Sequence, residues 1–230
     1  MRRIAALLLA MLVPFAAHAA HAQVIVYEEV IEEEYLVEAG GERFVEAHGI
    51  AVPVPAAPRG IASYGPFRVL DQDRAALVGT TGSAAPFQFA DMLRAHPGIR
   101  TLEMIECPGT EDDRANLRLG RMIRAAGIAT HVPAQGSVRS GAVELFLAGS
   151  RRTADPGAEF AVHAWMDDTG REATDYAAGA PENAKYLSYY QTMGMSVDEA
   201  RQFYAMTNSV PNADAKWLDA GEMARWVRLD

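Results

Sequence analysis

Between residue 61 and the C-terminus, short apolar runs alternate with longer segments in which apolar residues recur every three or four positions. Runs of the first kind predict buried strands, and they lie at 74–79, 99–107, 128–134 and 158–165. Segments of the second kind predict helices, and they lie at 82–98, 108–127 and 140–149. Repeated strand–helix–strand units of this kind predict an α/β domain whose sheet faces are covered by helices.

The C-terminal part is predicted to be helical, with helices at 181–194, 196–209 and 219–227. The helix starts carry residues that commonly cap helices. These residues are Ser83, Thr110 with Asp113, Ser196 with Glu199, and Asp219.

The first 22 residues have the three-part pattern of a secretory signal peptide. Arg2 and Arg3 form a positive n-region, residues 4–17 are apolar, and A-x-A sites precede Ala20 and Gln23. We therefore expect cleavage at one of these two sites and a periplasmic or secreted product. An uncleaved membrane anchor is the alternative.

Residues 23–60 are acidic at first and then rich in Pro and Ala, without a sustained period. This composition predicts a tether or a loosely docked arm. The remaining residues, 61–230, are numerous enough and apolar enough for one domain with one core. No segment after the signal is long and apolar enough to span a bilayer, so no membrane span is expected once the signal is cleaved.

Charge and cysteine content exclude several classes of function. The net charge of −9 at pH 7 argues against binding to a nucleic-acid backbone. Cys107 is the only cysteine, so neither an intramolecular disulfide nor a cysteine-based zinc site can form. We expect Cys107 to be a small buried residue, the alternative being a nucleophile. The histidines are scattered and no cofactor motif is present, so we expect no metal and no cofactor.

Ser140 begins the predicted helix at 140–149, after a strand and a short polar loop. Serine in this position is most often an N-cap. A hydroxyl beside unpaired N–H groups at the positive end of a helix is also suited to acyl transfer, because those groups can hold an oxyanion. Gly141 would let a substrate backbone approach closely. Both interpretations remain open from the residues alone.

His163 is the histidine whose position best suits chemistry. It lies near the end of the strand predicted at 158–165, just before a polar loop at 166–176. Strand ends that enter loops are where α/β domains gather their reacting groups. Position alone does not distinguish a structural His163 from a functional one.

Three segments together resemble the proteolytic subunit of Clp protease and crotonase-type proteins, and more closely the exported Clp-like serine proteases. They are ECPGTEDDRANLRLGRMIRAAGI at 106–128, SGAVELFLAG at 140–149 and RRTADPGAEFAVHAW at 151–165. The resemblance implies a repeated β-β-α superhelix with a helical C-terminal part. It also implies Ser140 as the nucleophile and His163 as the general base.

The resemblance further implies backbone N–H donors for an oxyanion at Gly141 and Thr110. Thr110 stands where the family has glycine. Arg139 stands where the family has a small residue, so this cation is expected to alter the pocket or to lie beside it. The segment NADAKWLDAGEMARW resembles the family's acid segment, which implies Asp214 as the third member of the triad, with Asn212 as the alternative.

These expectations combine into one function and one rival. The first is an exported serine hydrolase, peptidase-like, that acts on a peptide or another acyl substrate through Ser140, His163 and Asp214. The rival is a non-catalytic envelope module that keeps the fold and uses its cleft for binding or assembly. The resemblance also implies a homo-oligomer.

Overall fold

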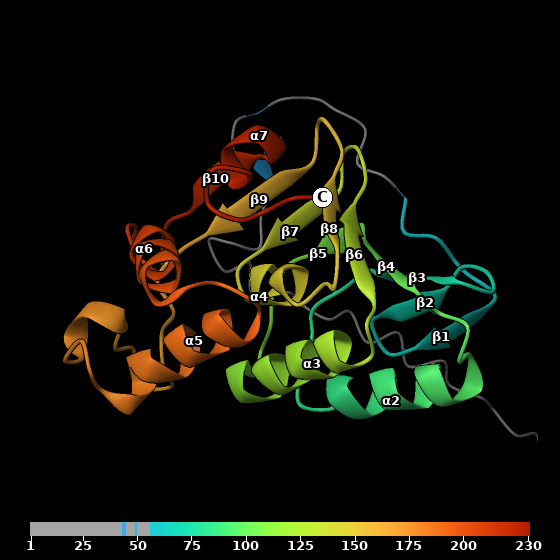
Figure 1. Cartoon of the computed structure of the whole chain (residues 1–230), viewed down its shortest axis with the longest axis horizontal. Helices are drawn as coiled ribbons and strands as arrows, with labels where there is room; N and C mark the ends of the chain where they lie inside the picture. The colour runs from blue at the N-terminus through green and yellow to red at the C-terminus, as the bar shows by residue number, and fades with distance from the viewer. Residues whose placement is uncertain (1–42, 45–48, 50–55) are drawn as a thin grey trace, which may run out of the picture. The chain divides into compact units, whose positions relative to one another are not determined.

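The computed structural model describes residues 43, 44, 49 and 56–230 (Figure 1). The predicted signal peptide and most of the arm at 23–60 lie outside the described residues. Within the described ranges, no helix combines the length and the apolarity needed to cross a bilayer.

The first sheet has six strands in the order β1-β2-β3-β4-β6-β8. The first three strands form an antiparallel meander, and the last four run parallel. Their bounds are β1 Ala62–Tyr64, β2 Phe67–Val69, β3 Arg74–Leu77, β4 Thr101–Met104, β6 Ala129–Val132 and β8 Arg152–Ala154.

The second sheet has four strands in the order β10-β9-β7-β5. Strands β5, β7 and β9 run parallel, and β10 pairs with β9 in the antiparallel sense. Their bounds are β5 Glu106–Cys107, β7 Ser137–Arg139, β9 Glu159–Val162 and β10 Lys216–Asp219.

From β4 to β9 the chain visits the two sheets alternately, which produces the expected β-β-α repeat. Each repeat places a strand in the first sheet, the next strand in the second sheet, and then a helix. The helices of this region are α2 Ala85–Ala95, α3 Asp113–Ala125 and α4 Ala142–Leu147. Figure 1 shows α2 and α3 side by side beneath the first sheet. The predicted α/β class with repeated β-β-α units is therefore confirmed.

Ile105 explains why the run at 99–107, predicted as one strand, is two. Its N–H donates to the carbonyl of Leu77 in the first sheet, at 3.2 Å. Its carbonyl accepts from the N–H of Ser137 in the second sheet, at 2.9 Å. One apolar run thus changes sheets at a single residue, and alternation of apolar positions does not reveal such a corner.

The C-terminal part is helical as predicted. It contains α5 Pro181–Thr192, α6 Val197–Thr207 and the short α7 Ala220–Met223, with a 3-10 turn at Ala173–Asp175 before them. The capping boxes at Ser196 and Asp219 are both formed, which confirms these two helix starts.

Two other predicted caps are wrong. Helix α2 begins after Ala84 with no side-chain cap, so Ser83 does not cap it. Helix α3 is capped by Asp112, whose side chain accepts from the N–H of Ala115 at 2.9 Å. The hydroxyl of Thr110 instead donates to the carbonyl of Thr81, at 2.9 Å.

Part of the segment 23–60 contacts the second sheet. The side chain of Arg43 is 3% exposed and pairs with Glu106 at 3.1 Å and with Glu159 at 3.3 Å. The ring of Phe44 lies edge-on to Trp217, with 5.7 Å between the ring centroids. At these two residues the segment is docked on the second sheet.

Candidate active site

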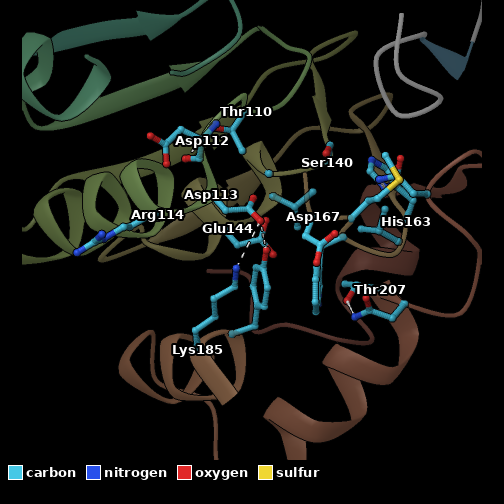
Figure 2. A pocket seen from close by; sticks show the side chains of 18 of the residues that line it. Thr110, Asp112, Asp113, Arg114, Ser140, Glu144, His163, Asp167, Lys185 and Thr207 are labelled. Carbon is cyan, nitrogen blue, oxygen red and sulfur yellow. Dashed lines mark hydrogen bonds and ion pairs between the residues drawn. The ribbon is translucent and has the colours of Figure 1, made fainter. Parts of the chain in front are cut away.

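The candidate site lies at one edge of the second sheet, where β5, β7 and β9 end. Ser140 directly follows β7, His163 directly follows β9, and Thr110 comes three residues after β5. Because these strands are parallel neighbours, their carboxyl ends meet at the same edge. Ser140, His163, Thr110 and Gly141 all line one pocket with a volume of about 1050 Å³ (Figure 2).

The ladder between β7 and β9 brings Ser140 next to the histidine strand. Arg139 pairs with Ala161 in the parallel register, and the N–H of Ser140 donates to the carbonyl of Ala161 at 2.9 Å. Continuing that register places Ser140 opposite Val162, one residue before His163. Neighbouring strands lie about 4.8 Å apart, so the two side chains belong to one small region.

Ser140 has a backbone conformation that residues other than glycine rarely adopt. Its φ is +49°, at the junction between β7 and α4. The helix begins after Gly141 with no side-chain cap, so the N-cap interpretation of Ser140 is wrong. Within the described residues, its hydroxyl forms no hydrogen bond, either with α4 or with His163. A left-handed non-glycine residue costs about 1–3 kcal/mol, and such strain concentrates at functional sites.

The two expected oxyanion donors lie against each other beside Ser140. A Cβ added to Gly141 would come within 2.4 Å of the Thr110 Cγ2. A Cβ added to Gly109, whose φ is +145°, would come within 3.0 Å of the Ser140 Cβ. In the part of the chain that the structure describes, the N–H groups of Thr110 and Gly141 have no hydrogen-bond acceptor. Both remain free to hold an anionic oxygen.

Asn116, a residue that the sequence analysis missed, joins these two segments. It is 2% exposed, and its amide nitrogen donates to the carbonyl of Gly141 at 2.5 Å. Its amide oxygen accepts from the hydroxyl of Thr81 at 3.0 Å. The carbonyl of Thr81 in turn accepts from Thr110. The sequence did hold a signal, because Asn116 lies three residues before Leu119 and so falls on the apolar face of its helix.

His163 has one ring nitrogen engaged and one free. Its Nδ1 lies 2.9 Å from the carbonyl oxygen of Ala164. Its Nε2 is buried and has no hydrogen-bond partner among the described residues. When Nδ1 carries the proton and donates it to Ala164, Nε2 holds a lone pair. In that tautomer Nε2 is the nitrogen that can accept a proton.

The structure places Asn212 beside His163. The amide nitrogen of Asn212 lies 3.1 Å from His163 Nδ1 and donates to the carbonyl of Ala164 at 3.0 Å. Asp214 is exposed, and its carboxylate accepts from the N–H of Ala215 at 2.7 Å. Among the hydrogen bonds of the described residues, none joins Asp214 to His163. The geometry therefore favours Asn212 over Asp214 as the residue that orients the ring.

Arg139 does not line the pocket, so the expectation of a cation beside it is wrong. Its side chain is 1% exposed and its guanidinium binds Glu106 at 2.5 Å. The same guanidinium donates to the hydroxyl of Ser137. Alternation along β7 explains this placement, because successive side chains of a strand point to opposite faces.

Cys107 is buried as expected. It is 0% exposed and its thiol lies 3.4 Å from the carbonyl oxygen of Leu77. Burial raises the pKa of this thiol well above its ordinary value. Because the thiolate is the reactive form, this environment disfavours Cys107 as a nucleophile.

Glu144 is a second pocket residue that the sequence analysis missed. It lies in the first turn of α4, is 8% exposed and accepts from the hydroxyl of Tyr190 at 2.7 Å. Burial raises the pKa of its carboxyl group to about 7, and the hydrogen bond from Tyr190 offsets only part of that effect. A lone glutamate inside the apolar run AVELFL was the available signal.

The raised pKa of Glu144 predicts a stability that falls as pH rises. The folded state keeps the proton up to about pH 7, whereas an unfolded glutamate loses it near pH 4.5. Unfolding therefore releases a proton between these values, which favours the unfolded state as pH rises. The variant Glu144→Gln has no carboxyl group at this position and lacks this effect. Between pH 5 and pH 8, the free energy of unfolding of the wild type should therefore fall by about 2 kcal/mol relative to that of the variant. Urea unfolding at both pH values measures this difference. A constant difference between the two proteins would contradict the expectation.

Comparison with known proteins shows a similarity of fold. No protein-family model matches the sequence, and no curated protein matches it. Among solved structures, the chain is similar to a ClpP1 mutant from Listeria monocytogenes, at 15% identity and a TM-score of 0.48, covering 67% of this chain and 87% of that chain. It is also similar to a mutant of the 1510-N membrane-bound stomatin-specific protease in complex with a substrate peptide, at 14% identity and a TM-score of 0.43, covering 69% of this chain and 74% of that chain. Similarity at this level does not extend to catalytic residues or to activity.

Proposed function

We propose that this protein is a serine hydrolase that cleaves a peptide or another acyl substrate, with Ser140 as the nucleophile. The observation that carries the proposal is the left-handed backbone of Ser140, whose hydroxyl has no hydrogen-bond partner among the described residues and belongs to the pocket that His163 also lines. A serine with a merely structural role has no need of this strain. Helix capping, the usual structural role, is absent here.

The proposed reaction begins with proton transfer. His163 Nε2 accepts the hydroxyl proton as Ser140 Oγ attacks the carbonyl carbon of the substrate. The carbonyl oxygen becomes an oxyanion, which the N–H groups of Gly141 and Thr110 stabilise. The imidazolium then gives its proton to the leaving group, and water hydrolyses the acyl-enzyme by the same steps.

Orientation of the imidazole falls to neutral groups in this proposal. The carbonyl of Ala164 accepts from Nδ1–H, and Asn212 holds that carbonyl in place. A carbonyl dipole stabilises the imidazolium less than a carboxylate does. We therefore propose a slower hydrolase than one with an aspartate at this position.

A fluorophosphonate probe tests the proposal directly. Ser140 Oγ should displace fluoride from the probe and form a phosphonate ester, which intact-mass spectrometry detects as a single adduct. The variant Ser140→Ala should give no adduct, because it lacks the attacking oxygen. The variant Ser150→Ala is a matched control, since Ser150 is exposed and does not line the pocket.

A folded wild-type protein that gives no adduct would overturn the proposal. It would favour the non-catalytic binding module instead. An adduct that persists in Ser140→Ala would place the nucleophile at another residue.

A further inference from the structure

The pocket that holds Ser140 continues past α4 into an acidic region near α3 and α5. Figure 2 shows Glu144, Asp113 and Lys185 in this region. The pocket has two cationic side chains, Arg114 and Lys185, against six carboxylates, which are Glu111, Asp112, Asp113, Glu144, Asp167 and Asp168. Excess acid of this kind does not by itself make a binding site, but Glu144 differs from the other carboxylates in being buried.

Glu144 is a buried carboxyl group with no cationic partner among the described residues. One oxygen, Oε1, accepts from Tyr190. No ion pair and no hydrogen bond from a second side chain joins this carboxyl group in the described part of the chain, and Glu144 lines the pocket. Buried carboxylates are ordinarily paired, because an isolated charge out of water is costly. The missing cationic partner of Glu144 therefore indicates a ligand that carries a cation.

Lys185 does not supply that cation. Its Nζ lies 3.8 Å from Asp113 Oδ2, and it also lies 5.3 Å from the ring centroid of Trp165. Asp113 further accepts from the hydroxyl of Tyr186. The lysine is thus engaged by Asp113 and by aromatic rings, and it leaves Glu144 unpaired.

Glu144 and Ser140 are placed so that one substrate can contact both, through a side chain next to its reacting carbonyl. Glu144 lies in the first turn of α4, which begins two residues after Ser140, and both residues line the pocket. Tyr190 and Trp165 line the same pocket, and aromatic rings accommodate the methylene stem and the planar head of an arginine. Both a reacting carbonyl and a basic side chain could therefore be held in one pocket.

We infer that Glu144 selects substrates that carry a basic side chain, arginine or lysine, beside the bond that Ser140 attacks. The inference rests on the proposed function only for the bond that is cleaved. Recognition of the basic side chain by Glu144 does not require cleavage. The oxygen Oε2 of Glu144 would accept a charge-assisted hydrogen bond from the guanidinium or ammonium group.

Binding to the Ser140→Ala protein tests the inference without turnover. The probes are two fluorescein-labelled tripeptides, Ala-Ala-Arg amide and Ala-Ala-citrulline amide, which differ by the charge of a planar head group. Fluorescence anisotropy at pH 8, where Glu144 is ionised, should show about tenfold tighter binding of the arginine peptide. Adding Glu144→Gln should remove that preference, because glutamine keeps the shape and an acceptor for Tyr190 but lacks the charge.

The control is Glu182→Gln in the same background. Glu182 also lies in the first turn of a helix, α5, but does not line the pocket. This variant should keep the tenfold preference. Urea unfolding verifies that each variant is folded.

Two results would overturn the inference: equal binding of the two peptides, or a preference that survives Glu144→Gln. A wild-type protein that binds the arginine peptide selectively but gives no fluorophosphonate adduct would support the inference and overturn the proposed function. A fluorophosphonate adduct on a protein that binds both peptides equally would support the proposed function and overturn the inference.

Discussion

Replacing His163 with glutamine is expected to slow fluorophosphonate labelling of Ser140 by about 10²- to 10⁴-fold. Glutamine can fill much of the same space and form hydrogen bonds, but it cannot accept the hydroxyl proton at neutral pH. The free Nε2 of His163 is the atom whose loss should produce this effect. Time courses of adduct formation, followed by mass spectrometry, give the rate for each protein.

The matched control for this prediction is His131→Gln. His131 lies in β6, with its Nδ1 2.8 Å from the hydroxyl of Thr153, and it does not line the pocket. Its replacement should leave the labelling rate unchanged. Equal rates for His163→Gln and the wild type would exclude His163 as the base.

The same assay decides between Asn212 and Asp214. Asn212→Ala removes the donor to the carbonyl of Ala164 and should slow labelling about five- to tenfold, the effect of losing one orienting hydrogen bond. Asp214→Ala changes an exposed carboxylate and should have no effect. The opposite result would restore the assignment that the sequence resemblance implies.

Replacing Arg139 with methionine is expected to lower the free energy of unfolding by about 3 kcal/mol. The guanidinium is 1% exposed and binds Glu106 and Ser137. Methionine fills most of the space but leaves the Glu106 carboxylate with one cation fewer. We place the effect at the low end of the range for broken buried pairs because Glu106 is 25% exposed and also pairs with Arg43. Urea unfolding followed by circular dichroism measures the change.

The double variant Arg139→Met with Glu106→Gln separates charge from packing. Removing both partners of a buried ion pair costs far less than removing one, because no uncompensated charge remains. The double variant should therefore be more stable than Arg139→Met alone. If the two are equally destabilised, lost packing of the arginine stem accounts for the effect and the ion pair does not.

Local patterns were sufficient to predict most of the elements. Helices α5 and α6 and the capping boxes at Ser196 and Asp219 depend on residues three or four positions apart, so the sequence contains their whole cause. The strands β1, β2, β7, β8 and β10 were missed. Four of them have only three residues each, and β10 has four, so they show too few periods to be recognised.

Some features of the candidate site could likewise be predicted from local patterns, and others could not. Neighbouring residues were enough to predict that a helix begins near Ser140 and that His163 lies at the end of a strand. The adjacency and parallel direction of β5, β7 and β9, which bring their ends to one edge, depend instead on contacts between distant segments. The same holds for the left-handed backbone of Ser140, the placement of Arg139 outside the pocket and the position of Asn212 beside His163. These facts depend on strand pairing and burial between residues far apart in the chain, and no local pattern contains them.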